Sequence, residues 1–343
     1  MRMWYVRTAR AAGVGTGGGR RNRRGSWSVL VRALAGATMA LVVVSCGDSG
    51  IGGGEGSARA DATAHVREDA GVVAATFTIL ADFASAVAGD RMEVRVLTPI
   101  GAEVHEHELR PRDFVNIEEA DVVLYNGYMI EQWMPQVRQV AHDEVELHAV
   151  AELTGAETIP IRLGEYEGVP DPHLWMNPAL AIRYVEVIRD IFVQLDPDGR
   201  EDYERNAAEY IGELEELKIE LEEAFAAVAE ERRVLITSEA AFLYFAEAFG
   251  FVHDGVWGTN HEDEGTPEQL ARVMDIVTER RPGAIFYEST ISDRHIRSIS
   301  DDTGVPVAGP LYVDSVSEPH GEAPTYLEMM RLNAERIVDA LGE

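Results

Sequence analysis

The chain has 343 residues and 46% hydrophobic content, which suits a globular protein with more than one lobe. Its 60 acidic side chains outnumber 30 basic ones, and the formal net charge of −30 disfavours binding to nucleic acid or to an anionic membrane surface. Cys46 is the only cysteine, so the sequence excludes intramolecular disulfides and a cysteine-based zinc cluster.

Residues 1–45 are predicted to form a lipoprotein signal peptide. Four arginines between positions 20 and 24 precede the apolar stretch 33–44, which is too short to span a bilayer stably. Val-Val-Ser-Cys then resembles a lipobox, so Cys46 is the predicted lipidation site and the protein is expected to be anchored outside the cytoplasmic membrane. An ordinary signal peptide with a chance cysteine is the alternative. Residues 46–70 are rich in glycine at their start and predict a flexible tether.

From residue 71 onward, short β-rich runs alternate with segments of helical periodicity. The predicted strands are 72–78, 93–97, 122–125, 145–150, 234–237, 251–256, 284–287 and 305–308. The predicted helices are 80–88, 112–119, 130–141, 178–195, 241–249, 267–279, 293–302 and 323–341. This alternation predicts an α/β fold whose mainly parallel sheets are flanked by helices. It also predicts an N-terminal α/β lobe of residues 71–196 and a C-terminal α/β lobe of residues 233–343.

Residues 197–232 predict a single long helix that joins the two lobes. Between 200 and 231 there is no proline and only one glycine, Gly212, and apolar side chains recur at helical spacing. A helix of this length is a rigid rod of roughly 46 Å. Two helices broken near Gly212 are the alternative.

Four potential metal ligands lie in separate segments, close to the ends of predicted strands or in the loops that follow. They are His105, His173, Glu239 and Asp314. Ligands of α/β proteins gather at the carboxyl ends of parallel strands, so a two-lobed fold could bring these side chains together. Any one of them alone is typical of a surface or helix-capping residue. Two imidazoles and two carboxylates together predict a site for a divalent transition metal.

Several ordered motifs between residues 71 and 343 resemble a known family. TPIGAEVHEHELRPRD, DPHLWMNP, TSEAAFLYFAEAFGF and GPLYVDS are similar to segments of the metal-binding solute-binding lipoproteins of ABC importers, the zinc, manganese and iron family with a long backbone helix. The resemblance implies two lobes of similar topology, a metal held between them, and delivery of that metal to a membrane permease.

The family's ligand motifs match this sequence at the same four positions, namely His105, His173, Glu239 and Asp314. The chain departs from the family at residues 103–104, where Glu-Val stands in place of the common Asp-Pro. It departs again at His107, where the family usually has an aromatic residue, and this makes His107 the alternative to His105 as the first ligand.

The ligand set favours Mn²⁺ over Zn²⁺ or Fe²⁺. Zinc-selective members of the family tend to present a third histidine, whereas this chain has Glu239 and no long histidine-rich run. Two carboxylates suit a harder ion of higher coordination number, although the Irving–Williams order still gives zinc high intrinsic affinity. Because protonated histidines cannot ligate, capture is expected to weaken below about pH 6.

The sequence therefore predicts a non-enzymatic, lipid-anchored receptor that carries manganese to an ABC permease and its ATPase. It is expected to act as a monomer and without nucleic acid. A zinc- or iron-specific receptor of the same type and a surface adhesin are the alternatives. A metalloenzyme is disfavoured because four protein ligands would close the site, and because HEHE at 105–108 lacks the H-E-x-x-H spacing.

Overall fold

The computed structural model describes residues 70–259 and 265–342. All of them belong to one compact unit, Glu55–Glu343, which is described here by itself. The predicted signal peptide, the predicted lipidation site Cys46 and residues 46–69 of the predicted tether lie outside the described residues. Within the described residues, no helix is both long enough and apolar enough to cross a membrane.

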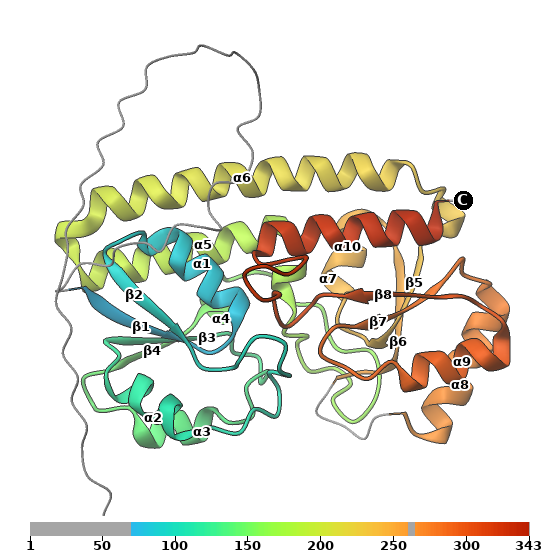
Figure 1. Ribbon diagram of the computed structural model, residues 1–343, viewed down its shortest axis with the longest axis horizontal. Coiled ribbons are helices and arrows are strands. Elements are labelled where there is room, and N and C mark those ends of the chain that lie inside the picture. The colour runs from blue at the N-terminus through green and yellow to red at the C-terminus, as the bar shows by residue number, and fades with distance from the viewer. Residues whose placement is uncertain (1–69, 260–264, 343) are drawn as a thin grey trace, which may run out of the picture. The chain divides into compact units, whose positions relative to one another are not determined.

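The first lobe is built on a four-stranded parallel sheet with the strand order β2-β1-β3-β4 (Figure 1). Its strands are β1 Gly71–Ala75, β2 Met92–Val96, β3 Val122–Tyr125 and β4 Glu146–Ala149. Its helices are α1 Thr78–Ala88, α2 Pro111–Glu118, α3 Met134–Val140, α4 Val150–Leu153 and α5 Pro178–Leu195. Side chains alternate between the two faces of β3, as strand geometry requires. Leu124 joins the core under α1 and α5, while Val123 packs with α2 and α3.

The second lobe contains two parallel strand pairs, β5-β6 and β7-β8, flanked by helices (Figure 1). The strands are β5 Val234–Glu239, β6 Val252–Trp257, β7 Ile285–Glu288 and β8 Val307–Leu311. The helices are α7 Leu243–Phe249, α8 Pro267–Arg280, α9 Arg294–Thr303 and α10 Tyr326–Leu341. Side chains of β5 also alternate between the two faces of the sheet. Ile236 packs with α8 and α9, whereas Leu235 joins the core shared with α7 and α10. The predicted α/β class with parallel sheets is confirmed.

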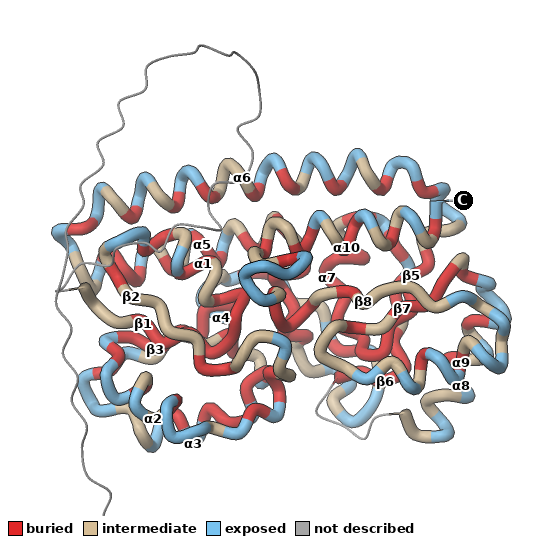
Figure 2. The backbone as a smooth tube through the Cα atoms, in the orientation of Figure 1, coloured by how far each residue is buried: buried red, intermediate tan, exposed pale blue. Residues whose placement is uncertain are grey.

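A single helix, α6, runs from Arg200 to Ala226 and extends along one side of both lobes (Figure 1). It continues through Gly212, so the alternative of two shorter helices is wrong. Its 27 residues correspond to about 40 Å, somewhat less than predicted, because a separate 3-10 turn forms at residues 230–232. One stripe of the helix is buried against the rest of the unit and the opposite face is exposed (Figure 2).

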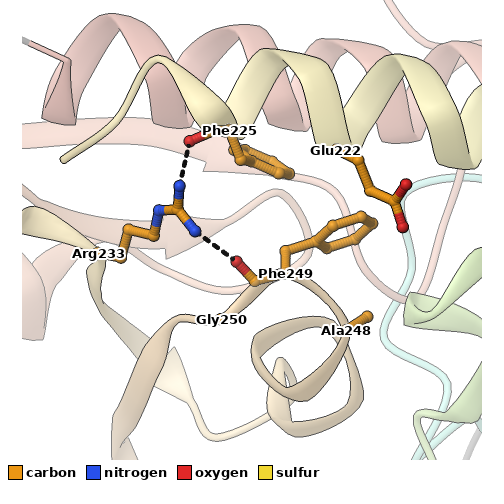
Figure 3. A pocket seen from close by; sticks show the side chains of 6 residues that line it. All are labelled: Glu222, Phe225, Arg233, Ala248, Phe249 and Gly250. Atoms are coloured by element: carbon orange, nitrogen blue, oxygen red, sulfur yellow. Dashed lines mark hydrogen bonds between the residues drawn. The ribbon is translucent and has the colours of Figure 1, made fainter. Parts of the chain in front are cut away.

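Arg233 fixes the end of α6 to the second lobe. Its guanidinium donates to the carbonyl oxygen of Phe225 at 2.8 Å and to that of Phe249, at the end of α7, at 3.3 Å (Figure 3). It also donates to the carbonyl oxygen of Val228 at 3.0 Å. A cation at two helix C-termini is favourable because the last carbonyls of a helix carry partial negative charge. Helix α6 is thereby tied rigidly to α7.

The buried core continues from one lobe into the other. Val73 of the first sheet and Leu235 of the second belong to the same hydrophobic cluster, through side chains of α1, α5, α6 and α10. A core shared in this way opposes wide opening of the lobes, since separating them would expose apolar surface to water.

The structure differs from the sequence prediction mainly at helix starts. Helix α10 was expected from residue 323 and begins at Tyr326, because Thr325 accepts a hydrogen bond from the N–H of Glu328 and acts as the N-cap. Helix α3 begins at Met134 rather than at residue 130, after a turn in which Tyr128 and Met129 adopt positive φ angles. The short helix α4 was not predicted.

Candidate metal centre

Four buried side chains from four separate segments converge between the two lobes. His105 lies in the loop after β2, His173 just before a 3-10 turn, Glu239 at the end of β5, and Asp314 shortly after β8. None of the four side chains is more than 1% exposed. His173 does not follow a strand directly, since helix α4 and a long loop separate it from β4, and in this respect the sequence prediction was too simple.

Their ligand atoms face one another at short distances. Glu239 approaches both histidines, with Oε1 3.6 Å from Nε2 of His105 and Oε2 3.8 Å from Nε2 of His173. Asp314 Oδ1 is also 3.8 Å from Nε2 of His173. Two ligands bound about 2.1 Å from one ion, in tetrahedral or octahedral arrangement, are about 3.0–3.4 Å apart. A small contraction of the observed site would therefore let these atoms share one ion.

Two of these atoms lack a hydrogen-bond partner among the described residues. They are Nε2 of His173 and Oδ1 of Asp314, both fully buried. Buried polar atoms are normally paired because leaving them unpaired costs about 1–3 kcal/mol each. A cation placed between them would satisfy both.

The ring of His173 is oriented by Asp171. Asp171 Oδ1 accepts from the His173 N–H at 3.0 Å and lies 3.2 Å from Nδ1 of the ring, which leaves Nε2 directed at the centre. The loop itself is held by Asn126, whose amide donates to the carbonyl of Pro172 at 3.0 Å, and by Tyr244, whose hydroxyl donates to the carbonyl of Asp171 at 3.0 Å. The ligating nitrogen is thus preorganised.

The electrostatic field of the centre favours positive charge. Burial lowers the pKa of His173, but the charges of Asp171, Glu239 and Asp314 outweigh it and raise that pKa to about 10. Burial raises the pKa of Asp314 to about 6, against the opposing charge of His173. A site that draws a proton onto a buried imidazole is suited to a divalent cation.

Glu288, at the end of β7, fixes the backbone that carries Glu239. Its Oε1 accepts from the N–H of Glu239 at 3.0 Å and its Oε2 from the N–H of Ser238 at 3.2 Å. Burial raises the pKa of Glu288 to about 8, and the hydrogen bonds from Ser238 and Glu239 oppose that rise. The two strand pairs of the second lobe are joined at their carboxyl ends through this side chain.

The segment that carries Asp314 is hydrogen-bonded to the first lobe. The indole N–H of Trp175 donates to the carbonyl of Val313 at 3.0 Å, and the N–H of Val316 donates to Oγ1 of Thr78 at 3.0 Å. Asp314 is thus held between two attachments to the first lobe.

His107, the alternative first ligand, points elsewhere. Its Nε2 lies 3.2 Å from Oδ2 of buried Asp113, and its ring packs edge-on against Trp133 at 5.2 Å. The structure brings His105, and not His107, to the other three side chains.

Glu103, which was not among the predicted ligands, also lies at the centre. Its Oε1 is 3.8 Å from Nε2 of His105, and the carboxylates of Glu103 and Asp314 form a ligand-atom group with His105 in which all atoms lie within 4.8 Å of one another. The signal was available in the sequence, because Glu103 precedes His105 by two residues just as Asp171 precedes His173.

The chain is similar in sequence to known metal-binding proteins. Residues 73–340 match the model of a family described as ZnuA, zinc-uptake complex component A, periplasmic. The iron-binding protein YfeA of Yersinia pestis is 38% identical over 271 residues, which cover 79% of this chain and 86% of the relative. The manganese-binding lipoprotein MntA of Halalkalibacterium halodurans is also 38% identical over 271 residues, covering 79% of this chain and 88% of the relative.

Solved structures show the same fold. A manganese-bound periplasmic metal-binding protein from Candidatus Liberibacter asiaticus aligns with a TM-score of 0.73 and 31% identity, over 79% of this chain and 99% of the other. The periplasmic zinc-binding protein TroA from Treponema pallidum aligns with a TM-score of 0.73 and 26% identity, over 80% of this chain and 100% of the other.

Proposed function

The chain belongs to the ZnuA family, and from that premise we propose that it is an extracytoplasmic receptor that carries manganese to an ABC importer. The proposed ligands of the ion are His105, His173, Glu239 and Asp314. The observation that carries the proposal is a pair of buried atoms, Nε2 of His173 and Oδ1 of Asp314, which lie 3.8 Å apart and have no hydrogen-bond partner within residues 70–259 and 265–342. A divalent cation placed between them would bind both atoms.

Manganese is proposed as the cargo on the grounds of ligand chemistry. Glu239 and Asp314 supply oxygen donors, and oxygen-rich sites suit hard ions that take more than four ligands. The curated relatives differ in the ions for which they are named, iron for YfeA and manganese for MntA, while the family description names zinc. Iron- or zinc-selective receptors of the same type are therefore the competing assignments.

Membership of the family supports the proposed partner and location. A receptor of this kind hands its ion to a membrane permease driven by an ATPase, and we propose that this chain does so as a monomer tethered through lipidated Cys46. In the proposed domain organisation, residues 71–196 and 233–343 form the lobes and residues 197–232 the linking helix. The acidic surface gives no basis for contact with nucleic acid.

A competition titration tests the proposal. The metal-stripped protein would be titrated with Mn²⁺, anaerobic Fe²⁺ and Zn²⁺, with tryptophan fluorescence as the second readout, because the ring of Trp175 lies 5.2 Å from that of His173. Sub-micromolar Mn²⁺ binding with a fluorescence change is expected, and His173→Ala should weaken it at least about 100-fold. If only Zn²⁺ binds tightly and changes the fluorescence, the protein is instead a zinc receptor. Unchanged affinity in His173→Ala and Asp314→Ala would overturn the site.

A further inference from the structure

We propose that Glu103 is a fifth protein ligand of the metal centre and that its carboxylate selects an ion of higher coordination number over zinc. The inference rests on the proposed function and adds a specificity-determining residue to that same site.

Glu103 lies close to the ligating nitrogen of His105. Its Oε1 lies 3.8 Å from Nε2 of His105, a separation equal to that between His173 Nε2 and Asp314 Oδ1 and close to the 3.6 Å between His105 Nε2 and Glu239 Oε1. Glu103 and Asp314 also belong to one group with His105 in which ligand atoms lie within 4.8 Å of one another. Glu103 therefore borders the volume between His105 and Asp314, two of the four proposed ligands.

A comparison within the chain shows what the longer side chain changes. Asp171 stands two residues before His173, accepts from that histidine's N–H, and reaches Nδ1, the nitrogen turned away from the centre. Glu103 stands two residues before His105 and likewise accepts from the histidine's N–H, at 3.1 and 3.0 Å to its two oxygens. Its carboxylate, however, lies within 4 Å of Nε2, on the metal side of the ring.

Glu103 also accepts from the N–H of Glu106 at a long 3.4 Å, but its hydrogen bond to the N–H of His105 does not by itself require a glutamate. Asp171 demonstrates that an aspartate two residues before a histidine can make the same bond to the backbone. The additional methylene of Glu103 is what brings the carboxylate to the Nε2 side of His105. This is the feature that makes it a ligand rather than only a cap of the loop.

The charges are compatible with a third carboxylate. Glu239 and Asp314 are 1% exposed and already neutralise a dication, so a third fully buried carboxylate would be costly. The side chain of Glu103 is 27% exposed, so solvent stabilises its charge while one oxygen faces the centre. A fifth, oxygen ligand suits Mn²⁺, whereas Zn²⁺ is usually satisfied by four.

The experiment compares Glu103→Asp with the wild-type protein. The aspartate retains the charge and the backbone hydrogen bond but withdraws the carboxylate from the centre. We expect the Mn²⁺ affinity to fall about tenfold or more while the Zn²⁺ affinity changes less than about threefold. In the Co²⁺-loaded protein, the visible absorption should intensify as the coordination number falls. Glu103→Gln, which keeps the length and removes the charge, should shift the Mn²⁺-to-Zn²⁺ affinity ratio in the same direction.

Glu106→Gln is the matched control, because Glu106 is an exposed carboxylate on the same loop. It should leave the affinity ratio unchanged, and thermal unfolding of each metal-free variant would verify its fold. If both Glu103 variants retain the wild-type ratio and Co²⁺ spectrum while His173→Ala loses binding, Glu103 is only a loop cap and the receptor assignment stands. Failure of the wild-type protein to bind any of these metals would overturn both.

Discussion

The backbone N–H of Gly101 donates a hydrogen bond of 2.7 Å to Oγ of Ser315, and this bond joins the loop of His105 to the segment of Asp314. Ser315 is adjacent to Asp314 in sequence and is itself buried. An ion shared by His105 and Asp314 would be enclosed behind this link. Release of the ion by separation of the two segments must therefore break it.

Removal of the Ser315 hydroxyl should accelerate metal release. In Ser315→Ala the N–H of Gly101 loses its acceptor, and a hydrogen bond contributes about 0.5–1.5 kcal/mol net. We expect dissociation of the ion to become up to about tenfold faster, with a smaller effect on association. Stopped-flow chelation by excess EDTA measures the rate. Ser317→Ala is the control, because the Ser317 hydroxyl accepts from Ala323 within the second lobe. Equal dissociation rates in Ser315→Ala and Ser317→Ala would show that the hydrogen bond between Gly101 and Ser315 does not retain the ion.

Glu288 should matter for both stability and metal affinity. Glu288→Gln leaves only one strong acceptor for the N–H groups of Ser238 and Glu239, and a buried N–H without a partner costs about 1–3 kcal/mol. Unfolding by urea should reveal a loss of that size, and Mn²⁺ affinity should fall because the backbone of Glu239 is less fixed. Glu279→Gln, at an exposed position of α8, supplies the control. Normal stability of Glu288→Gln would show that the second acceptor oxygen of this side chain is dispensable.

Periodicity and ligand chemistry were sufficient to predict much of this molecule. The strand–helix alternation predicted the α/β class, and the apolar stripe with Leu214, Leu217 and Leu221 predicted the long helix. These signals are local, because they arise from side chains that repeat along one face of one element. The four proposed ligands were predicted from residue chemistry and from the family resemblance, since His173 follows no strand directly and strand ends alone do not bring it to the other three.

The surroundings of the centre were not predictable in the same way. The pairing of His107 with Asp113 depends on how the loop after β2 folds back onto α2, and no periodicity encodes that turn. The support of Glu239 by Glu288 joins residues 49 positions apart. The role of Glu103 depends on one methylene of reach. Contacts of this kind are decided by tertiary geometry and become visible only in the folded chain.

The interior of α6 offers a clean stability test. Gly212 lies mid-helix, and a Cβ added there would meet nothing within 4 Å. Gly212→Ala should therefore stabilise the protein by about 0.5–1 kcal/mol through the lower conformational entropy of the unfolded chain. Gly304→Ala is the opposite case, because Gly304 also has open space but a φ of +74°, and it should destabilise by about 1–2 kcal/mol. Urea midpoints measure both. A destabilised Gly212→Ala would mean that the helix requires a local bend.

Metal affinity should depend on pH well above the range of an ordinary histidine. In the metal-free protein the pKa of His173 is raised to about 10, so at neutral pH the ion must displace a proton from this ring. Affinity for Mn²⁺ should therefore rise with pH by up to about tenfold per unit between pH 7 and 9, whereas an unperturbed histidine would give a plateau above about pH 7. Below about pH 6, protonation of Asp314 should steepen the loss. Calorimetry in buffers of different ionisation enthalpy would detect the released proton. A flat affinity from pH 7 to 9 with no proton release would show that the carboxylates do not hold His173 in its charged form.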